Sequence, residues 1–297
     1  MMKTILVAGC TGKVGEKIVK ALVKRGANVR AIVRSGTELQ KQEKLAAIGA
    51  EVVIADMSDA AALASVCQGV DCVVSALSGL HDAIVDAQSK LLDAAVTAGV
   101  PRFIPSDFAS DFTQQPAGEN RSFDLHKEFE QYVDKSPIAA TSILNGAFAD
   151  LILGPGAPLF DTKNHSVSYW GDKANWKIDF ATTDDTADYT AAAALDTQTP
   201  RFLRIASFQI TPTELASVGK EIAQQDFTLV QMGSMEELSV STKAARAANP
   251  EGETEIMPAW QGMQYVYSML CVQNRSLDND RYPDVKWTSA QDALAKV

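Results

Sequence analysis

The chain has 297 residues, of which 46% are hydrophobic and 22% are charged, and its formal net charge is −10. This composition is typical of a globular protein with a substantial core, and the acidic balance argues against nucleic acid or an anionic membrane surface as a partner. The four cysteines show no CxxC pair and no histidine at metal-ligand spacing, and no signal peptide or membrane-spanning apolar run is present, so we expect reduced thiols, no metal site and a cytoplasmic protein.

The N-terminal residues carry the first motif. An apolar strand is expected at residues 4–8 and an amphipathic helix at residues 14–25, which Gly26 ends. Between them lies the sequence Gly9-Cys10-Thr11-Gly12-Lys13-Val14-Gly15. Glycines at this spacing let the backbone turn sharply and approach phosphates, and the amide groups at the helix N-terminus favour negative charge. The segment therefore predicts the pyrophosphate site of a dinucleotide.

Strands and helices alternate through the rest of the first half. Further strands are expected at residues 29–33, 52–54, 72–76 and 102–104, and helices at residues 37–48, 59–66 and 82–98. This alternation is typical of an α/β fold of the Rossmann type, a doubly wound parallel sheet with helices on both faces. We expect residues 1–150 to form an NADP-binding domain with its ligand at the carboxyl ends of the strands.

Residues that follow the strands are the candidates for cofactor contacts. They are Arg34, Asp56, Met57, Ser75, Ala76, Leu77, Ser106, Asp107 and Phe108. Arg34 decides between the two nicotinamide cofactors, because an NAD site commonly has Asp or Glu at this position, whereas Arg welcomes a 2′-phosphate. The sequence favours NADPH. The alternative interpretation of Arg34 is a solvated surface residue.

The second half is less regular. A helix at residues 123–133 and a strand at residues 140–144 precede the sequence Asn145-Gly146-Ala147-Phe148, again at the ligand end. The Gly- and Pro-rich residues 154–158 are expected to form a loop over the substrate. Strands are then expected at residues 202–206 and 227–230, and helices at residues 186–195, 213–224, 234–248 and 258–272. We expect residues 151–297 to form a smaller α/β substrate-binding annex, with some elements returning to the main sheet.

Several of these motifs together resemble a known family. The glycine motif at residues 9–15, Val33-Arg34, residues 102–108, His126-Lys127 and residues 141–148 occur in the order and rough spacing of the NmrA-like, isoflavone reductase-like branch of the atypical short-chain dehydrogenases. The branch includes phenylcoumaran benzylic ether, pinoresinol-lariciresinol and isoflavone reductases. The resemblance implies an oxidoreductase that transfers a hydride from NADPH to a small aromatic or conjugated substrate: a phenylpropanoid-like compound, enone, quinone or benzylic ether.

The resemblance also implies roles for single residues. Lys127 matches the helix lysine that acts as general acid/base, and Lys127, Asn145 and Phe148 join the expected cofactor contacts. The chain departs from the plant reductases at residues 128–131, where Glu-Phe-Glu-Gln replaces Ile or Val followed by Arg-Arg. A surface lysine that pairs with a neighbouring glutamate is the alternative for Lys127. His126 is a possible proton shuttle, but it points about 100° away from Lys127 on the helix, so a position at the surface or at a helix cap is the favoured interpretation.

Two other functions are weighed against the reductase. A noncatalytic NADP-sensing regulator of the NmrA type would bind the cofactor and a protein partner without turnover. A sugar-nucleotide epimerase would need a Tyr-x-x-x-Lys helix, and the pair Tyr169 and Lys173 spans Gly171 in what reads as a turn after a strand. A homodimer is left open.

Overall fold

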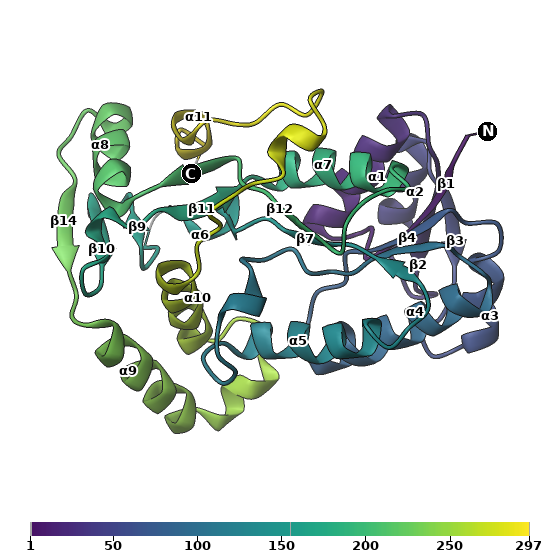
Figure 1. The fold of residues 1–297 in the computed structure, drawn as a ribbon, viewed down its shortest axis with the longest axis horizontal. Helices are drawn as coiled ribbons and strands as arrows, with labels where there is room; N and C mark the ends of the chain where they lie inside the picture. Colours follow the sequence, from purple (N-terminus) through teal and green to yellow (C-terminus); the bar gives the residue numbers. More distant parts are fainter. Residues whose placement is uncertain (1, 155, 297) are drawn as a thin grey trace.

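The computed structural model describes residues 2–154 and 156–296, and its largest sheet, of six parallel strands, lies toward the end of the molecule that holds the N-terminus (Figure 1). The strand order is β3-β2-β1-β4-β5-β6. The strands are β1 (Thr4–Ala8), β2 (Asn28–Val33), β3 (Glu51–Ile54), β4 (Cys72–Ser75), β5 (Arg102–Ile104) and β6 (Ala139–Ala140). The predicted doubly wound sheet is confirmed. Its order reverses between β1 and β4, the point at which such sheets bind ligands beyond their carboxyl ends.

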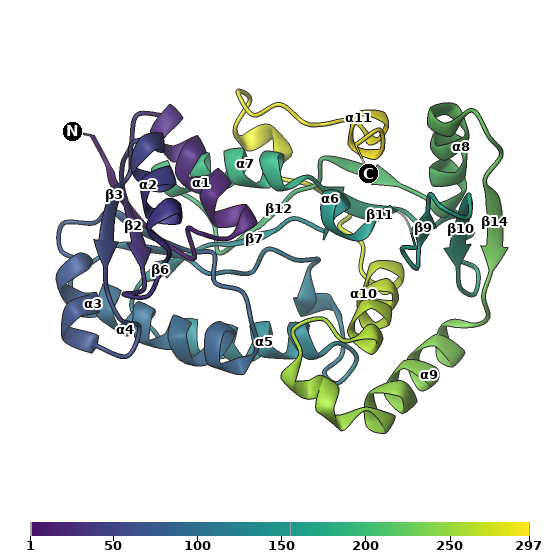
Figure 2. The ribbon, with the colours of Figure 1, turned by 180° about the vertical axis from the view of Figure 1, so that it is seen from behind.

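Helices cover both faces of this sheet. One face carries α1 (Lys13–Lys24), α2 (Leu39–Ile48) and α7 (Thr183–Leu195), and the other carries α3 (Ala60–Val66), α4 (Gln88–Thr97) and α5 (Arg121–Val133). Figure 2 shows the two layers from behind. The π-helical turn η1 (Asp82–Ala87) precedes α4, so the predicted helix at residues 82–98 begins with a wider turn.

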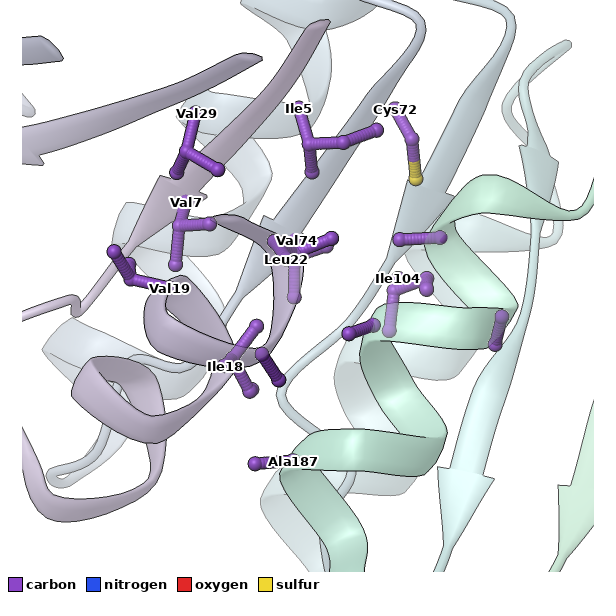
Figure 3. Close-up of a cluster of buried hydrophobic side chains, with 14 of the residues drawn as sticks. Ile5, Val7, Ile18, Val19, Leu22, Val29, Cys72, Val74, Ile104 and Ala187 are labelled. Atoms are coloured by element: carbon purple, nitrogen blue, oxygen red, sulfur yellow. The ribbon is translucent and has the colours of Figure 1, made fainter. Parts of the chain in front are cut away.

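Alternate residues of the strands form two cores. Figure 3 shows Val7, Val74 and Ile104 facing Ile18 and Leu22 of α1. Ala187 of α7 lies against the same cluster, so a helix from the second half of the chain completes this face. On the opposite face, buried residues of the strands, such as Phe103, pack with α4 and α5. Burial of these apolar side chains on both faces is the main stabilising contribution to the sheet.

The expected strand at residues 140–144 is wrong as a single element. The structure divides it into β6, which pairs with β5, and β7 (Ser142–Leu144), which pairs with β12 (Phe202–Arg204). Thr141 forms the junction. Its amide donates to the carbonyl of Phe103 at 3.0 Å, and its hydroxyl donates to the carbonyl of Pro200 at 2.9 Å. The chain thus changes hydrogen-bonding partners at one residue.

Two three-stranded sheets and further helices complete the described residues of the second half. The sheets contain β8 (Ala147–Phe148), β11 (Ile178–Ala181) and β13 (Phe208–Ile210), and β9 (Phe160–Asp161), β10 (Ser166–Tyr169) and β14 (Thr228–Gln231). The helices are α6 (Ala149–Ile152), α8 (Pro212–Ala223), α9 (Met235–Ala248), α10 (Ala259–Cys271) and α11 (Ala290–Leu294). The predicted helices at residues 213–224, 234–248 and 258–272 are confirmed to within one or two residues.

The fold also bears on the other features considered from the sequence, namely the Tyr169 and Lys173 pair, membrane helices, metal groups and cysteines. Tyr169 ends β10 and Lys173 begins a short 3-10 turn, so the two are not a helical catalytic pair. Over residues 2–154 and 156–296, no helix is both long and apolar enough to cross a membrane, and no group of three or more His, Cys, Asp or Glu is placed to hold a metal. The cysteines are free, and three of the four are buried. Pro155 of the expected loop lies outside the described residues, and the domain division at residue 150 stays a prediction.

Candidate functional site

The turn between β1 and α1 leaves the first amide groups of a helix open toward a cavity. Gly9 turns the chain with a φ of +76°, and the amide of Gly12 donates to the carbonyl of Gly9 at 3.0 Å. Gly12 is the N-cap of α1 and has no side chain to cap the helix, so the N–H groups of the first turn have no partner within it. Gly12, Lys13 and Val14 line the cavity. A helix N-terminus in this position favours a phosphate group.

The three glycines of this turn have different roles. A Cβ atom on Gly9 would lie 2.3 Å from the carbonyl oxygen of Ala76, and one on Gly15 would lie 2.3 Å from the carbonyl oxygen of Gly9. Both glycines are therefore required by the protein's own backbone. Gly12 is exposed, and its Cβ would approach no atom closer than 3.3 Å. Gly12 keeps the surface of the turn open, which fits the close approach of a dinucleotide pyrophosphate.

A second cavity, of about 320 Å³, opens where β2 and β3 end. Its wall is formed by residues 34–37 and Asp56. A backbone hydrogen bond and a side-chain hydrogen bond from Ser58 lower the pKa of Asp56, so its carboxylate is ionised at neutral pH. The guanidinium of Arg34 and the hydroxyls of Ser35 and Thr37 line the same cavity. These groups suit a phosphate ester.

The main cavity has a volume of about 370 Å³ and lies at the carboxyl ends of β1, β4 and β5. It extends from the start of α1 to α5, and from there to α10 in the second half of the chain. Most of its wall is apolar, including Leu77, Phe108, Leu125, Phe148, Met257 and Tyr265. Hydroxyl, amide and imidazole groups are spaced among them, including Ser106, Ser110, Ser122, His126, Gln261 and Ser268. A small, largely apolar ligand with a few polar groups suits this lining.

The structure places the predicted site residues in three groups. Those that line the main cavity are Gly12, Lys13, Val14, Ala76, Leu77, Ser106, Phe108 and Phe148. Arg34 and Asp56 line the second cavity. The others do not line either cavity. Thr11 is exposed, Met57 packs against the core, and Lys127 lies outside both walls. The remaining ones lie in or beneath the loops at the strand ends and are buried or half-buried: Gly9, Gly15, Ser75, Asp107 and Asn145. Two other phenylalanines, Phe112 and Phe160, are core residues and do not line the main cavity.

The positions of Lys127 and His126 relative to the main cavity are the reverse of those that the sequence predicts. The ammonium group of Lys127 donates to the carbonyl of Gln115, and this lysine lies outside the walls of both cavities. His126, which was expected at the surface or at a helix cap, is buried and lines the main cavity. Its ring stacks on Phe112, with the centroids 5.4 Å apart and an interplanar angle of 22°.

The periodicity of α5 explains this exchange. Asn120 caps the helix by accepting from the amides of Ser122 and Phe123, so the helix begins two residues earlier than expected. Its buried face then includes Phe123, His126 and Phe129, at intervals of three residues. Neighbouring residues on a helix are about 100° apart, so burial of His126 turns Lys127 away from the cavity.

A buried carboxylate lies behind His126. The side chain of Asp107 is 1% exposed, and its Oδ1 atom lies 3.2 Å from Nδ1 of His126. Its Oδ2 atom accepts from the hydroxyl of Ser142 at 2.6 Å, and that hydroxyl accepts from Arg201 at 2.6 Å. The contacts join the loop after β5 to α5 and β7, and they hold the carboxylate in one position beside the imidazole.

The rim of the main cavity depends on Arg121. Its guanidinium donates to the carbonyls of Gly252, Glu253, Glu255 and Ile256 at 2.9 to 3.3 Å, and it lies 4.6 Å from the ring centroid of Trp260. Ile256 and Met257, which line the cavity from this rim segment, are 59% and 58% exposed. No role for this arginine is expected from the sequence, because the predicted helix at residues 123–133 begins after it.

Replacement of Arg121 by methionine is expected to loosen this rim. Hydrogen bonds from a charged group contribute about 1.5 to 3 kcal/mol, and methionine keeps the apolar volume but loses all four carbonyl contacts. We expect faster amide hydrogen exchange over residues 252–257. Arg246→Met is the matched control, since Arg246 contacts the Trp260 ring and the carboxylate of Glu253 without binding those carbonyls. Equal exchange rates in the two variants would contradict the anchoring role.

Comparisons with known proteins extend over the whole chain. The model of the family described as "NmrA-like family" matches residues 1–238. Pinoresinol reductase 1 of Arabidopsis thaliana is 30% identical over 312 aligned residues, which cover 98% of this chain and 95% of the relative. A bifunctional pinoresinol-lariciresinol reductase of Linum usitatissimum is 28% identical, covering 98% and 97%.

Solved structures give the same result for the fold. The structure described as "AtPrR2 with NADP+ and (+)pinoresinol" superposes with a TM-score of 0.83 at 25% identity, covering 100% of this chain and 99% of that one. An isoflavone reductase superposes with a TM-score of 0.81 at 21% identity, covering 99% of each chain. The latter supports the architecture alone.

Proposed function

The chain belongs to the NmrA-like family, and on that premise we propose that it is an NADPH-dependent reductase that transfers a hydride to a small aromatic or conjugated substrate. One observation carries the proposal. A single cavity extends from the uncapped N-terminus of α1, which suits a pyrophosphate, to a largely apolar chamber lined by Phe148, Tyr265 and Met269. Cofactor and substrate would therefore meet within one cavity.

The cofactor side of the proposal rests on the residues that would hold NADPH. The turn at Gly12 and the first amides of α1 fit the pyrophosphate, and Arg34 with its neighbouring hydroxyls fits the 2′-phosphate. When bound, the reduced nicotinamide supplies the hydride. The protein supplies orientation, with Phe108 and Leu77 among the residues that line the cavity.

The substrate side rests on the chamber lining. Aromatic and apolar side chains with a few hydroxyl and amide groups accommodate a neutral, flat molecule that carries hydroxyl, ether or carbonyl oxygens. AtPrR2, the structural relative at 25% identity, was solved with pinoresinol. We accordingly expect a phenylpropanoid-like compound, an enone, a quinone or a benzylic ether to accept the hydride.

Oxidation of NADPH over a panel of these four substrate classes tests the proposal. We expect turnover with at least one class and a much lower rate with NADH. The variant Leu125→Trp places a large ring in the chamber, and it is expected to lose turnover while keeping NADPH affinity in a fluorescence titration. Tight NADPH binding with no turnover over the whole panel would instead indicate an NADP-sensing regulator.

A further inference from the structure

We propose that His126, oriented by Asp107, is the group that donates a proton to the substrate oxygen, and that Lys127 does not take part. The inference rests on the proposed reductase function and assigns its acid. His126 lines the main cavity from α5, whereas the ammonium group of Lys127 donates to the carbonyl of Gln115. A proton donor must be within hydrogen-bonding reach of its acceptor, and of these two neighbours only His126 forms part of the cavity wall.

The two ring nitrogens of His126 have different surroundings. Nδ1 is buried and lies 3.2 Å from Oδ1 of Asp107. Within the described residues neither atom has a hydrogen-bond partner, so the 3.2 Å approach is a close contact between an imidazole nitrogen and a carboxylate oxygen that can bond to one another. An imidazole whose Nδ1 faces a carboxylate presents Nε2 on its other side. Nε2 is then the nitrogen available to a ligand in the cavity.

Asp107 is fixed in place from behind. Its Oδ2 atom accepts from Ser142, and Ser142 accepts from Arg201, so a line of hydrogen bonds runs from a cation to the carboxylate. The side chain of His126 is 8% exposed and stacks on Phe112, which restricts rotation of the ring. A carboxylate in this position sets the tautomer and the orientation of the imidazole, so Asp107 is a positioning residue and His126 the catalytic one.

Other charged groups near the pair are already engaged. On α5, Glu130 lies one turn after His126, and its carboxylate is 3.9 Å from Arg201. Arg201 also pairs with Asp134 at 3.0 Å. Asp111, which precedes Phe112, pairs with Arg204 at 2.7 Å. Glu130 and Asp134 therefore share Arg201, and Asp111 pairs with Arg204, which leaves Asp107 as the carboxylate in contact with the imidazole.

The proton transfer balances with the hydride that NADPH supplies. For a conjugated carbonyl substrate, a carbon–hydrogen bond forms with the hydride and a π bond of the substrate breaks. The displaced electron pair moves to the carbonyl oxygen. The Nε2–H bond of protonated His126 breaks as an O–H bond forms on that oxygen, which gives an alcohol or an enol. The substrate gains two electrons and two hydrogens, and the nicotinamide is oxidised.

The test compares neighbouring residues on α5. His126→Gln is expected to lower kcat by about 100-fold, the scale of general acid catalysis, and to leave the fluorescence-measured NADPH affinity within about threefold. Lys127→Gln is expected to keep at least about a third of the wild-type kcat, because the side chain that it replaces faces Gln115. Loss of turnover in Lys127→Gln with retention in His126→Gln would overturn the assignment.

Two further measurements separate a chemical role from a structural one. Exogenous imidazole is expected to restore part of the activity of His126→Ala, since the deletion leaves a space of matching shape beside Asp107. Asp107→Asn should lower kcat more than it raises KM, and adding it to His126→Ala should cost little more, because residues that act as a unit are not additive. Absence of rescue together with additive losses would overturn the pairing. A wild-type protein without turnover on any substrate would instead remove the proposed function itself.

Discussion

Replacement of Gly9 by alanine is expected to destabilise the protein by about 2 to 5 kcal/mol and to weaken NADPH binding at least about tenfold. Two costs combine. A non-glycine residue at a φ of +76° costs about 1 to 2 kcal/mol. The new Cβ atom would also lie 2.3 Å from the carbonyl oxygen of Ala76, and relief of such overpacking typically costs a further 1 to 3 kcal/mol.

The clash is with backbone, which limits how it can relax. The amide of Ala76 donates to the carbonyl of Ala8 at 2.8 Å, so Ala76 continues the pairing of β1 with β4. A shift of Ala76 would move Leu77 in the cavity wall, and a shift of Gly9 would move the start of α1. Either movement displaces groups that we assign to NADPH.

Gly26→Ala is the matched control for Gly9→Ala. Gly26 has a φ of +78°, almost the same as Gly9, but its Cβ would meet no atom within 4 Å. This variant is expected to lose only the backbone cost, about 1 to 2 kcal/mol, and to bind NADPH normally. Denaturant unfolding and fluorescence titration measure both quantities. Equal losses of stability in the two variants would mean that the contact with Ala76 relaxes freely.

The sequence predicts the first half of the fold well for local reasons. The strand at residues 72–75 is apolar without interruption, as expected of a strand buried on both faces, and helices α1 and α2 end where Gly26 and Gly49 adopt positive φ values. Loop positions at the ligand edge follow from the order of the strands. Arg34 and Asp56 therefore lie together in the second cavity although they are 22 residues apart in the sequence.

The strands that the sequence does not predict depend on hydrogen bonds to residues far away in the sequence. Strand β11 contains Asp179, whose burial is supported by Gln209 and by the amide of Asn274. No local pattern in residues 178–181 indicates a strand with a charged residue at its centre. Likewise, β7 separates from β6 because Ser142 bonds to the carbonyl of Arg201, a partner 59 residues away.

The orientation of helix α5 is a different case, since the signal that places His126 toward the interior is local. Phe123, His126 and Phe129 recur at intervals of three, and Asn120 is a favourable N-cap. The role of Lys127 is implied by resemblance to a family motif and stays a prediction, whereas the inward position of His126 follows from this periodicity. Attention to the apolar face of the helix would have placed His126 toward the interior.

Replacement of Arg34 by alanine is expected to raise KM for NADPH by about 10- to 100-fold while changing KM for NADH by less than about threefold. A charged hydrogen bond to phosphate contributes about 1.5 to 3 kcal/mol, which corresponds to this range. The loss is enlarged by Asp56, because its ionised carboxylate shares the cavity and would face the 2′-phosphate without a cation. Initial rates with each cofactor measure the effect.

Lys44→Ala provides the control for charge alone. Lys44 belongs to α2, follows Arg34 by ten residues, and pairs with Glu16 at 2.7 Å outside the second cavity. The substitution Lys44→Ala removes the same formal charge as Arg34→Ala. Because the partner of Lys44 is a carboxylate of the protein, KM for either cofactor should change by less than about threefold. An equal rise of both KM values in Arg34→Ala would point to a disrupted loop at residues 34–37. An unchanged KM for NADPH would return Arg34 to the role of a solvated surface residue, because a guanidinium that binds the 2′-phosphate cannot be removed without cost.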